Sequence, residues 1–284
     1  MSYQIVDCRD LGPERLTSAM NAAFSDYVVP LSMTVEAFMD FQKQRGFSSR
    51  HSFVVLQGEE IVAFWFSSVP NPAYGNRAYT LSVGTCPELR RKGLSRQLFE
   101  TVVRAQKRDA ANGLQLEVVS TNAKAVKAYE SFGFSRKRKL RVCKLKTDGL
   151  LPLKPVHLQL ATLSVGEIPE NEAEFFDTAP TPQNSRAALA GLAETSHIVG
   201  ARRRGELVGW GAAFKDGAVA QIAVRKDQRR SGIGRTMLHQ LAEQTGAEQL
   251  TFVNIDESAV GINAFLNKEG AEEILQQFEM RFVF

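Results

Sequence analysis

Two segments of the sequence, PELRRKGLSRQLF at residues 87–99 and KDQRRSGIGRTML at residues 226–238, share one pattern and decide the fold. In each segment an arginine pair precedes a glycine, and apolar residues then recur with the spacing of an amphipathic helix. The matching residues are Arg90, Arg91, Gly93 and Arg96 in the first segment and Arg229, Arg230, Gly232 and Arg235 in the second, at an offset of 139 residues. The chain is therefore predicted to contain an internal repeat.

The surroundings of the two segments also match. Upstream lie strand-like segments at 78–85 and 218–224, each preceded by a hairpin pattern that turns near Gly58 or Gly205. Downstream, we expect the long helices to end at Gly113 and Gly246 and to be followed by short strands at 114–119 and 250–253. A shorter helix follows each strand, and in the first copy Gly133 ends it. Each copy is thus predicted to run hairpin, strand, glycine-containing loop, helix, strand, helix, strand.

Length and composition are those of a folded protein with two domains. The chain has 284 residues, 44% hydrophobic and 23% charged, which excludes a disordered or fibrous protein. The Pro- and Gly-containing segment KTDGLLPLKPVHLQ marks the boundary, so we expect an N-terminal domain at 1–146, a linker at 147–156 and a C-terminal domain at 157–284. Since there is no apolar run of about 18 residues and no secretory signal, we expect a cytoplasmic protein without a membrane span.

Charge and cysteine usage narrow the classes of ligand. Three cysteines and four histidines show neither a disulfide framework nor metal-ligand spacing, so no metal site is expected. A net charge of +4 suits an anionic ligand such as a phosphorylated cofactor. The run RKRKLR at 136–141 could bind phosphates, or could be a solvated strand edge. The net charge falls short of a nucleic-acid footprint, so no nucleic-acid partner is expected, and a nucleic-acid binder that uses this basic run stays a minor alternative.

The repeated loop suits a phosphate. A strand that ends, turns through R-x-x-G and opens a helix directs backbone N–H groups and the positive end of the helix dipole at one point. Gly93, Gly232 and Gly234 remove side chains that would block close approach, and the arginines add positive charge. The spacing fits neither a Walker loop nor a Rossmann fingerprint.

The loop resembles the acyl-CoA loop, (Q/R)-x-x-G-x-(G/A), of the GCN5-related N-acetyltransferase (GNAT) family. In the first copy the resemblance extends over LEVVSTNAKAVKAYESFGF at 116–134, and as a tandem it covers nearly the whole chain. It implies an α/β (α+β) protein of two GNAT-type domains, each a mixed, mostly antiparallel twisted sheet with a splayed central strand pair flanked by helices. Ser95 departs from the family pattern, which prefers Gly or Ala there.

The resemblance also implies acetyl-CoA as the cofactor, with its pyrophosphate on the loop and its pantetheine on the exposed strand edge. The residues expected to bind it are Val83, Gly84, Thr85, Arg90, Arg91, Lys92, Gly93, Leu94, Ser95, Arg96 and Asn122 in the first copy, and Ile222, Val224, Arg229, Arg230, Ser231, Gly232, Ile233, Gly234 and Arg235 in the second. Asn122 is equally explained as a helix N-cap.

Two residues of the first copy carry proton-transfer roles by resemblance. Acyl transfer to an amine needs a base for the amine proton and an acid for the thiolate. In the ribosomal-protein N-terminal acetyltransferases, which share these motifs, the Glu matching Glu117 is the base and the Tyr matching Tyr129 is the acid. Alternatively, Glu117 is a solvated strand residue and Tyr129 is a core residue.

The second copy lacks both groups. Leu266 stands at the Tyr position, and Val253 or Asn254 at the Glu position. We therefore expect transfer in the first copy, although in tandem members that resemble mycothiol synthase the second half is the active one. The second copy could bind acyl-CoA only, be degenerate, or catalyse with His197 or Asp256.

Three further hypotheses stay open. A covalent acyl-Cys at Cys86 is disfavoured because no histidine is placed to activate it. A non-catalytic acyl-CoA-binding or scaffold protein is the main alternative to an enzyme. The acceptor would be a small-molecule or peptide amine held by the first helices, whose aromatic residues are equally explained by core packing. The aromatic residues are Phe24, Tyr27, Phe38 and Phe41, and the nearby acids are Asp26, Glu36 and Asp40.

Overall fold

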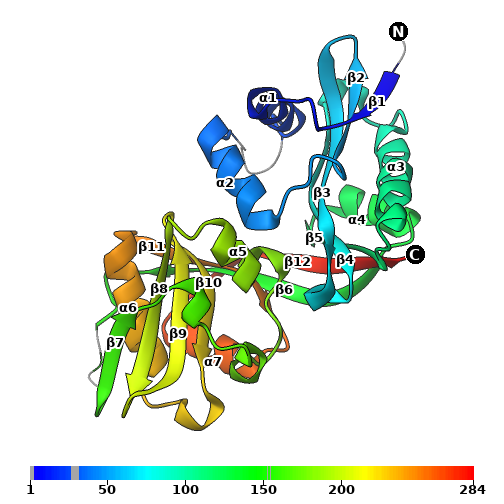
Figure 1. The fold of residues 1–284 in the computed structure, drawn as a ribbon. Helices are drawn as coiled ribbons and strands as arrows, with labels where there is room; N and C mark the ends of the chain where they lie inside the picture. Colours follow the sequence, from blue (N-terminus) through cyan, green and yellow to red (C-terminus); the bar gives the residue numbers. More distant parts are fainter. Residues whose placement is uncertain (1–2, 27–31, 152, 154) are drawn as a thin grey trace. The chain divides into compact units, whose positions relative to one another are not determined.

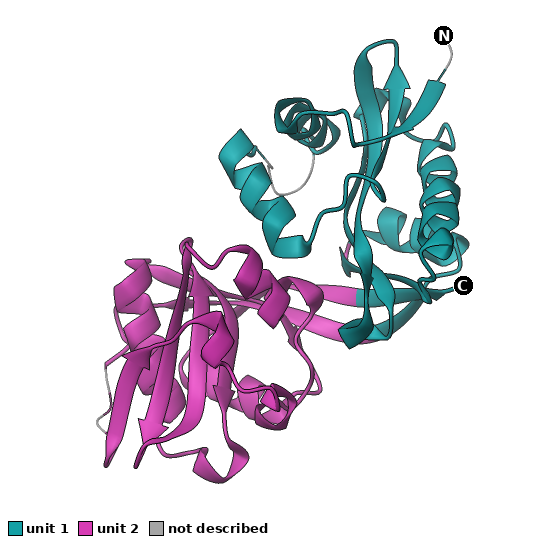
Figure 2. Cartoon of the chain, viewed as in Figure 1, with its two compact units in different colours: residues 1–118, 122–137, 279–284 teal, residues 119–121, 138–278 magenta. Residues whose placement is uncertain are grey.

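The computed structural model describes residues 3–26, 32–151, 153 and 155–284. The chain forms two compact units, shown in teal and magenta in Figure 2. Unit 1 comprises Met1–Val118, Asn122–Lys137 and Glu279–Phe284, and unit 2 comprises Val119–Thr121 and Arg138–Phe278. This division differs from the one expected from the sequence, since residues 138–146 belong to unit 2 and the last residues of the chain to unit 1.

Unit 1 is a sheet covered on both faces by helices (Figure 1). Its strands follow the order β1, β2, β3, β4, β5, β12. Helices α1 and α2 pack on one face, around Phe38, Phe64 and Phe66, and α3 packs on the other, against β2 and β3. The elements are β1 (Tyr3–Asp7), α1 (Pro13–Ala23), α2 (Val35–Arg45), β2 (Phe53–Gln57), β3 (Glu60–Asn71), β4 (Arg77–Thr85), α3 (Leu94–Arg108), β5 (Gly113–Val119) and α4 (Ala123–Ser131).

Unit 2 repeats this plan. Its strands follow the order β12, β6, β11, β10, β9, β8, β7, and α6 packs on β8 and β9. Strands β6 and β12 contribute residues to both units, and so does β5, whose last residue Val119 belongs to unit 2. The elements are β6 (Ser135–Lys146), β7 (Leu158–Thr162), α5 (Arg186–Gly191), β8 (Ser196–Arg203), β9 (Glu206–Phe214), β10 (Ala218–Val224), α6 (Ile233–Thr245), β11 (Gln249–Asp256), α7 (Val260–Lys268) and β12 (Glu272–Val283).

In each unit one pair of neighbouring strands is parallel and parts after a short stretch. β4 pairs with β5 at Arg77–Tyr79, and β10 pairs with β11 at Ala218 and Val219. The pairs β1–β2, β2–β3 and β3–β4 of unit 1, and β7–β8, β8–β9 and β9–β10 of unit 2, are antiparallel. The predicted fold class, with mixed and mostly antiparallel strands and one splayed pair in each unit, is confirmed, but the strands form one 12-stranded sheet rather than two sheets.

The expected helix ends are right in part. Gly246 ends α6 in the left-handed conformation at φ 63°, and Gly133, at φ 97°, follows the C-cap residue of α4. The expectation that Gly113 ends the first long helix is wrong, because α3 ends at Arg108 and Ala110 takes the left-handed conformation. Gly113 begins β5 instead, where a Cβ would lie 2.0 Å from the carbonyl oxygen of Phe282.

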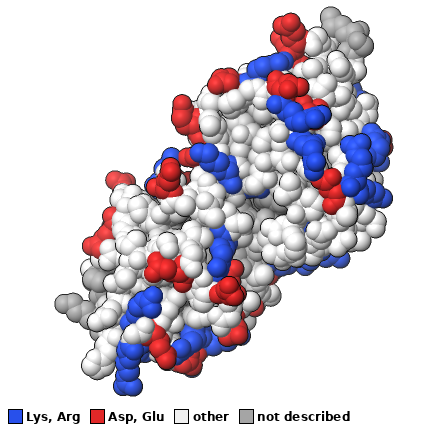
Figure 3. All heavy atoms as spheres, in the orientation of Figure 1, with Lys and Arg blue, Asp and Glu red and all other residues white. Residues whose placement is uncertain are grey.

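The basic run at 136–141 is not a strand edge, because β6 lies between β11 and β12. Its side chains form ion pairs with acids: Arg136 with Glu130, Lys139 with Glu257, and Arg141 with Glu273 at 2.6 Å. On the face seen in Figure 3, basic and acidic side chains are interspersed. The run is therefore largely neutralised by its neighbours.

Candidate functional site

The first candidate phosphate site is the loop at 90–96, here called the first cradle. Arg91 adopts φ 64° and Gly93 φ 80°, so the chain turns sharply before α3 begins at Leu94. No side chain caps this helix N-terminus, and a Cβ on Gly93 would meet nothing within 4 Å. Uncapped N–H groups beside open space are what a bound diphosphate requires.

The second cradle, at 229–235, has the same backbone. Arg230 adopts φ 59°, Gly232 adopts φ 85°, and no side chain caps α6. The second cradle differs from the first because Leu153 lies against it. A Cβ added to Gly232 would lie 3.0 Å from Leu153 Cδ1, and the Leu153 carbonyl accepts a hydrogen bond from the Thr236 hydroxyl. The first cradle is thus open and the second is partly covered.

The first arginine of each cradle forms hydrogen bonds with other residues of the protein. Arg90 donates to both oxygens of Asp26, to the Ala23 carbonyl and to the Thr85 carbonyl. Its hydrogen bonds lower the pKa of Asp26. These contacts tie the loop to the end of α1 and to the end of β4.

Unit 2 repeats this arrangement. Arg229 donates to Asp177 at 2.6 Å, to the Phe175 carbonyl at 2.8 Å and to the Val224 carbonyl at 3.0 Å. Burial raises the pKa of the Asp177 carboxyl, but the hydrogen bond and charge of Arg229, together with backbone hydrogen bonds from Gly261 and Ile262, outweigh it and the net shift is downward. Sequence reasoning named Asp26 only as an acid near the acceptor and missed Asp177, although an F-x-D pattern at 24–26 and 175–177 signals both as partners of the cradle arginines.

A cavity of about 1180 Å³ lies in unit 2 where β10 and β11 part. Its lining includes the whole second cradle, Ile222 and Val224 on β10, and residues of β11 and α7. Lys226 and Lys268 add positive charge to the lining. The residues predicted to bind the cofactor in the second copy are therefore brought together around one cavity.

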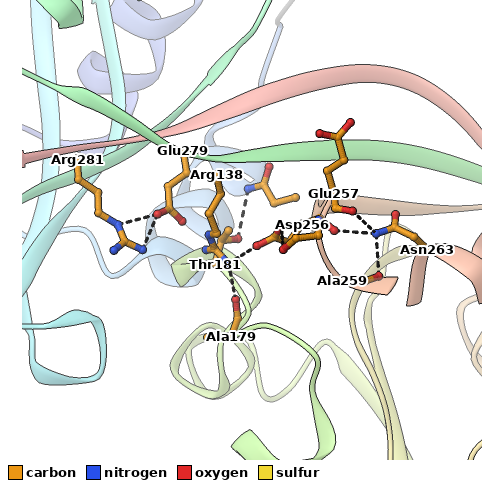
Figure 4. Close-up of polar contacts among 11 residues, drawn as sticks. Arg138, Ala179, Thr181, Asp256, Glu257, Ala259, Asn263, Glu279 and Arg281 are labelled. Atoms are coloured by element: carbon orange, nitrogen blue, oxygen red, sulfur yellow. Dashed lines mark hydrogen bonds and ion pairs between the residues drawn. The ribbon is translucent and has the colours of Figure 1, made fainter. Parts of the chain in front are cut away.

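The polar residues of β11 that line this cavity are hydrogen-bonded (Figure 4). Asn254 accepts from Gln277 and donates to Thr181, and its φ of 61° lies within the irregularity of β11. Asp256 accepts from the backbone and hydroxyl of Ser258 and lies 3.5 Å from Arg138. His197, the other group suggested for this copy, lies on β8 opposite Ala213.

Glu117 lies on β5 in unit 1 just beyond its last pair with β4. It is half-buried, and its Oε2 accepts a hydrogen bond from the phenol of Tyr79. Burial, followed by the nearby carboxylate, raises the pKa of Tyr79 well above its usual value, so the phenol stays protonated. Glu117 is therefore not a solvated strand residue, and sequence reasoning missed its partner.

Tyr129 on α4 packs in an aromatic cluster. Its ring lies edge-on to Trp65 at 6.2 Å and contacts Phe132 and Phe134. Trp65 also packs on Phe99 of α3, so Tyr129 belongs to the α3 side of the sheet. Tyr79 belongs to the opposite side, with α1 and α2. The two predicted catalytic residues thus lie on the two faces that flank the parting strands.

Five other predicted cofactor residues of unit 1 have clear local roles. Val83, Gly84 and Thr85 pair with β3, and a Cβ on Gly84 would lie 2.5 Å from the Phe64 ring, so packing explains this glycine. Asn122 is the N-cap of α4 and accepts from the Ala125 amide at 3.1 Å. Ser95 lies 3.2 Å from Thr85 through their hydroxyls.

Other groups raised by the sequence fall as follows. Burial raises the pKa of the Cys86 thiol, which does not favour a nucleophile. Phe38 is fully buried and stacks on Phe41, and Phe24 packs on Phe64. Tyr27 lies outside the described residues.

The described part of the chain lacks two kinds of feature. It contains no group of three or more His, Cys, Asp or Glu side chains that could hold a metal ion. None of its helices is both long enough and apolar enough to cross a membrane.

Comparison with known families gives two matches in tandem. A family model described as "Acetyltransferase (GNAT) family" matches residues 16–134, and one described as "Acetyltransferase (GNAT) domain" matches residues 164–280. No curated protein matches the sequence.

Solved structures share the fold over the whole chain. A tandem GNAT protein from the clavulanic acid biosynthesis pathway is 15% identical with a TM-score of 0.72, covering 99% of this chain and 98% of its own. A GCN5-related N-acetyltransferase from Sphaerobacter thermophilus is 16% identical with a TM-score of 0.72, covering 99% and 95%. A putative acetyltransferase from Pyrococcus horikoshii is 14% identical with a TM-score of 0.71, covering 99% and 89%.

Proposed function

The chain is a tandem member of the GNAT acetyltransferase family, and from this premise we propose that it is an N-acetyltransferase acting in unit 1. The acyl donor is acetyl-CoA, and the acceptor is a primary amine of a small molecule or peptide. The observation that carries the proposal is the half-buried Glu117 carboxylate, held beside the point where β4 and β5 part, in the unit whose phosphate cradle at the start of α3 is open.

The residues of unit 1 fit the cofactor. The uncapped N-terminus of α3 and the space over Gly93 suit the diphosphate, while Arg91, Lys92 and Arg96 supply charge. Among the described residues, the pairing of β4 with β5 ends at Tyr79, so the edge at Val83–Thr85 is available to pantetheine. When bound, acetyl-CoA supplies an activated thioester carbonyl.

The chain's own groups manage the protons. Glu117 accepts a proton from the attacking amine, directly or through a water, as the C–N bond forms. Tyr129 donates its phenolic proton to the sulfur as the C–S bond breaks. The apolar ring contacts of Tyr129 restrict its orientation, which favours such a directed donation.

Unit 2 supports a second candidate, which is transfer in the C-terminal half. The cavity of about 1180 Å³ around the second cradle favours it. Against it stand Asn254 and Leu266 at the positions of the base and the acid, since neither can move a proton at neutral pH. We therefore propose that unit 2 binds acyl-CoA without turnover.

Two pairs of variants test this assignment. We expect Glu117→Gln and Tyr129→Phe each to lower kcat about 100-fold or more while acetyl-CoA affinity stays unchanged. Ser95→Glu and Gly234→Glu form a matched pair, because each places a carboxylate at the second residue of a helix below a cradle. Such a carboxylate is tolerated at a helix N-terminus but repels a diphosphate.

Activity is followed by release of the CoA thiol, and binding by calorimetry. Loss of turnover in Ser95→Glu with retention in Gly234→Glu supports catalysis in unit 1. The reverse result would move the reaction to unit 2. Unchanged turnover in both Glu117→Gln and Tyr129→Phe would remove these residues from the mechanism.

A further inference from the structure

We propose that Tyr79 is a positioning residue for acetyl transfer, which fixes the Glu117 carboxylate and keeps it ionised. The inference rests on the proposed role of Glu117 as the base and adds the group through which that base is held. Tyr79 has no place in the motifs shared with the family, since it lies upstream of the cradle, 38 residues before Glu117 in the chain.

The position of Tyr79 follows from the sheet. Tyr79 pairs with Gln115 in the last pair of β4 with β5. Because side chains alternate along a strand, Glu117 projects from the same face as Gln115, one step beyond this last pair. The phenol therefore reaches Glu117 Oε2 across the gap where the strands begin to part.

The direction of the hydrogen bond follows from the two groups, because an ionised carboxylate can only accept and the phenol therefore directs its proton to Glu117. Burial and the Glu117 carboxylate raise the pKa of the Tyr79 phenol, and Arg45 at the C-terminal end of α2 opposes them with its positive charge. The chain of groups Arg45, Tyr79 and Glu117 thus favours a carboxylate that is ionised and held in one orientation.

The surroundings of Tyr79 make it a clean target. It is 6% exposed and packs with Phe64, Phe66 and Leu81 in the core under α1 and α2. Its ring can therefore be kept as Phe while the hydroxyl alone is removed.

Other charged groups on β4 and β12 interact with one another. On β12, Glu279 accepts two hydrogen bonds from Arg281, at 2.6 and 2.7 Å (Figure 4). Arg77, two residues before Tyr79, is influenced electrostatically by both of these groups. If the pH dependence of turnover changes when the Tyr79 hydroxyl is removed, the change is therefore assigned to Glu117, the partner of that hydroxyl.

The test is Tyr79→Phe in the full chain, with Tyr3→Phe on exposed β1 as the control. Removing a donor from the ionised carboxylate makes it easier to protonate, so the acidic limb of kcat/KM moves to higher pH by about one unit. We expect kcat near neutral pH to fall about tenfold, with acetyl-CoA affinity unchanged. Arg45→Met shifts the same limb in the same direction by less.

A double-mutant cycle separates positioning from packing. If Tyr79 acts through Glu117, Tyr79→Phe has no further effect on turnover in the Glu117→Gln background. A wild-type pH profile in Tyr79→Phe, or equal losses in both backgrounds, would overturn the inference. Wild-type turnover in Glu117→Gln alone would instead overturn the proposed function on which it rests.

Discussion

Replacing Arg229 by Met tests whether the two arginines of the second cradle have different roles, although the sequence predicts that both of them bind the cofactor. Arg229 contacts one carboxylate and two carbonyls, whereas Arg230, the next residue, is exposed. The structure therefore predicts that Arg229 maintains the shape of the cradle and that Arg230 is the residue available to a ligand. The matched variants are Arg229→Met and Arg230→Met.

The size of the stability loss follows from the contacts of Arg229. A hydrogen bond to a charged group contributes about 1.5–3 kcal/mol, and each bond to a carbonyl about 1 kcal/mol. The Arg229 and Asp177 side chains are 28% and 21% exposed, so solvent screening reduces the ionic part. Asp177 also keeps its bond from the Gly261 amide, at 2.8 Å. We expect Arg229→Met to destabilise unit 2 by about 3 kcal/mol.

Urea denaturation of the full chain, with the transition of unit 2 followed by Trp210 fluorescence, measures this loss. The corresponding fall in Tm is about 6–12 °C for a domain of this size. Arg230→Met should stay within about 0.5 kcal/mol of the wild type and should weaken CoA binding at the second cradle by about five- to tenfold. If the urea concentration at the midpoint of unfolding is the same for Arg229→Met as for the wild type, the structural role assigned to Arg229 is wrong.

Three further changes test other features. Asp177→Asn should destabilise unit 2 at neutral pH. Because folding lowers the pKa of Asp177, through Arg229, the difference in stability between variant and wild type should shrink as pH falls through the acidic range. Stabilities of the two proteins that never converge at acidic pH would contradict this. Gly113→Ala should lose about 3 kcal/mol because its Cβ would meet the Phe282 carbonyl, and chemical denaturation measures it, with wild-type stability as the contrary result. Leu153→Ala should tighten CoA binding at the second cradle several-fold by clearing the space over it, and calorimetry showing equal or weaker binding would refute that reasoning.

The sequence predicts the elements that local pattern controls. The two cradles, the hairpins at Gly58 and Gly205 and the N-cap at Asn122 all follow from residues close together in the chain. The predicted end of the first long helix is wrong. A glycine is required at position 113 because the backbone of Phe282, far along the sequence, lies against it.

Features of the fold and the site that depend on contacts between distant segments of the chain could not be predicted from the sequence. The partner of Glu117 lies 38 residues away and the partners of the two cradle arginines lie 64 and 52 residues away, so no spacing rule connects them. The sequence also gives no sign that residues 138–146 belong to unit 2 and residues 279–284 to unit 1. Each strand has the alternating pattern that is expected in either unit.

The placement of residues 279–284 in unit 1 bears on how the protein is made. Protein domains generally fold in order as the ribosome emits them, at about 5–20 residues per second. Here β12, the strand beside β5, is synthesised well after the other strands of the N-terminal sheet, so that flank of β5 stays unpaired for on the order of ten seconds. During that interval β5 has a bare flank, which is a natural place for a chaperone to act on the nascent polypeptide.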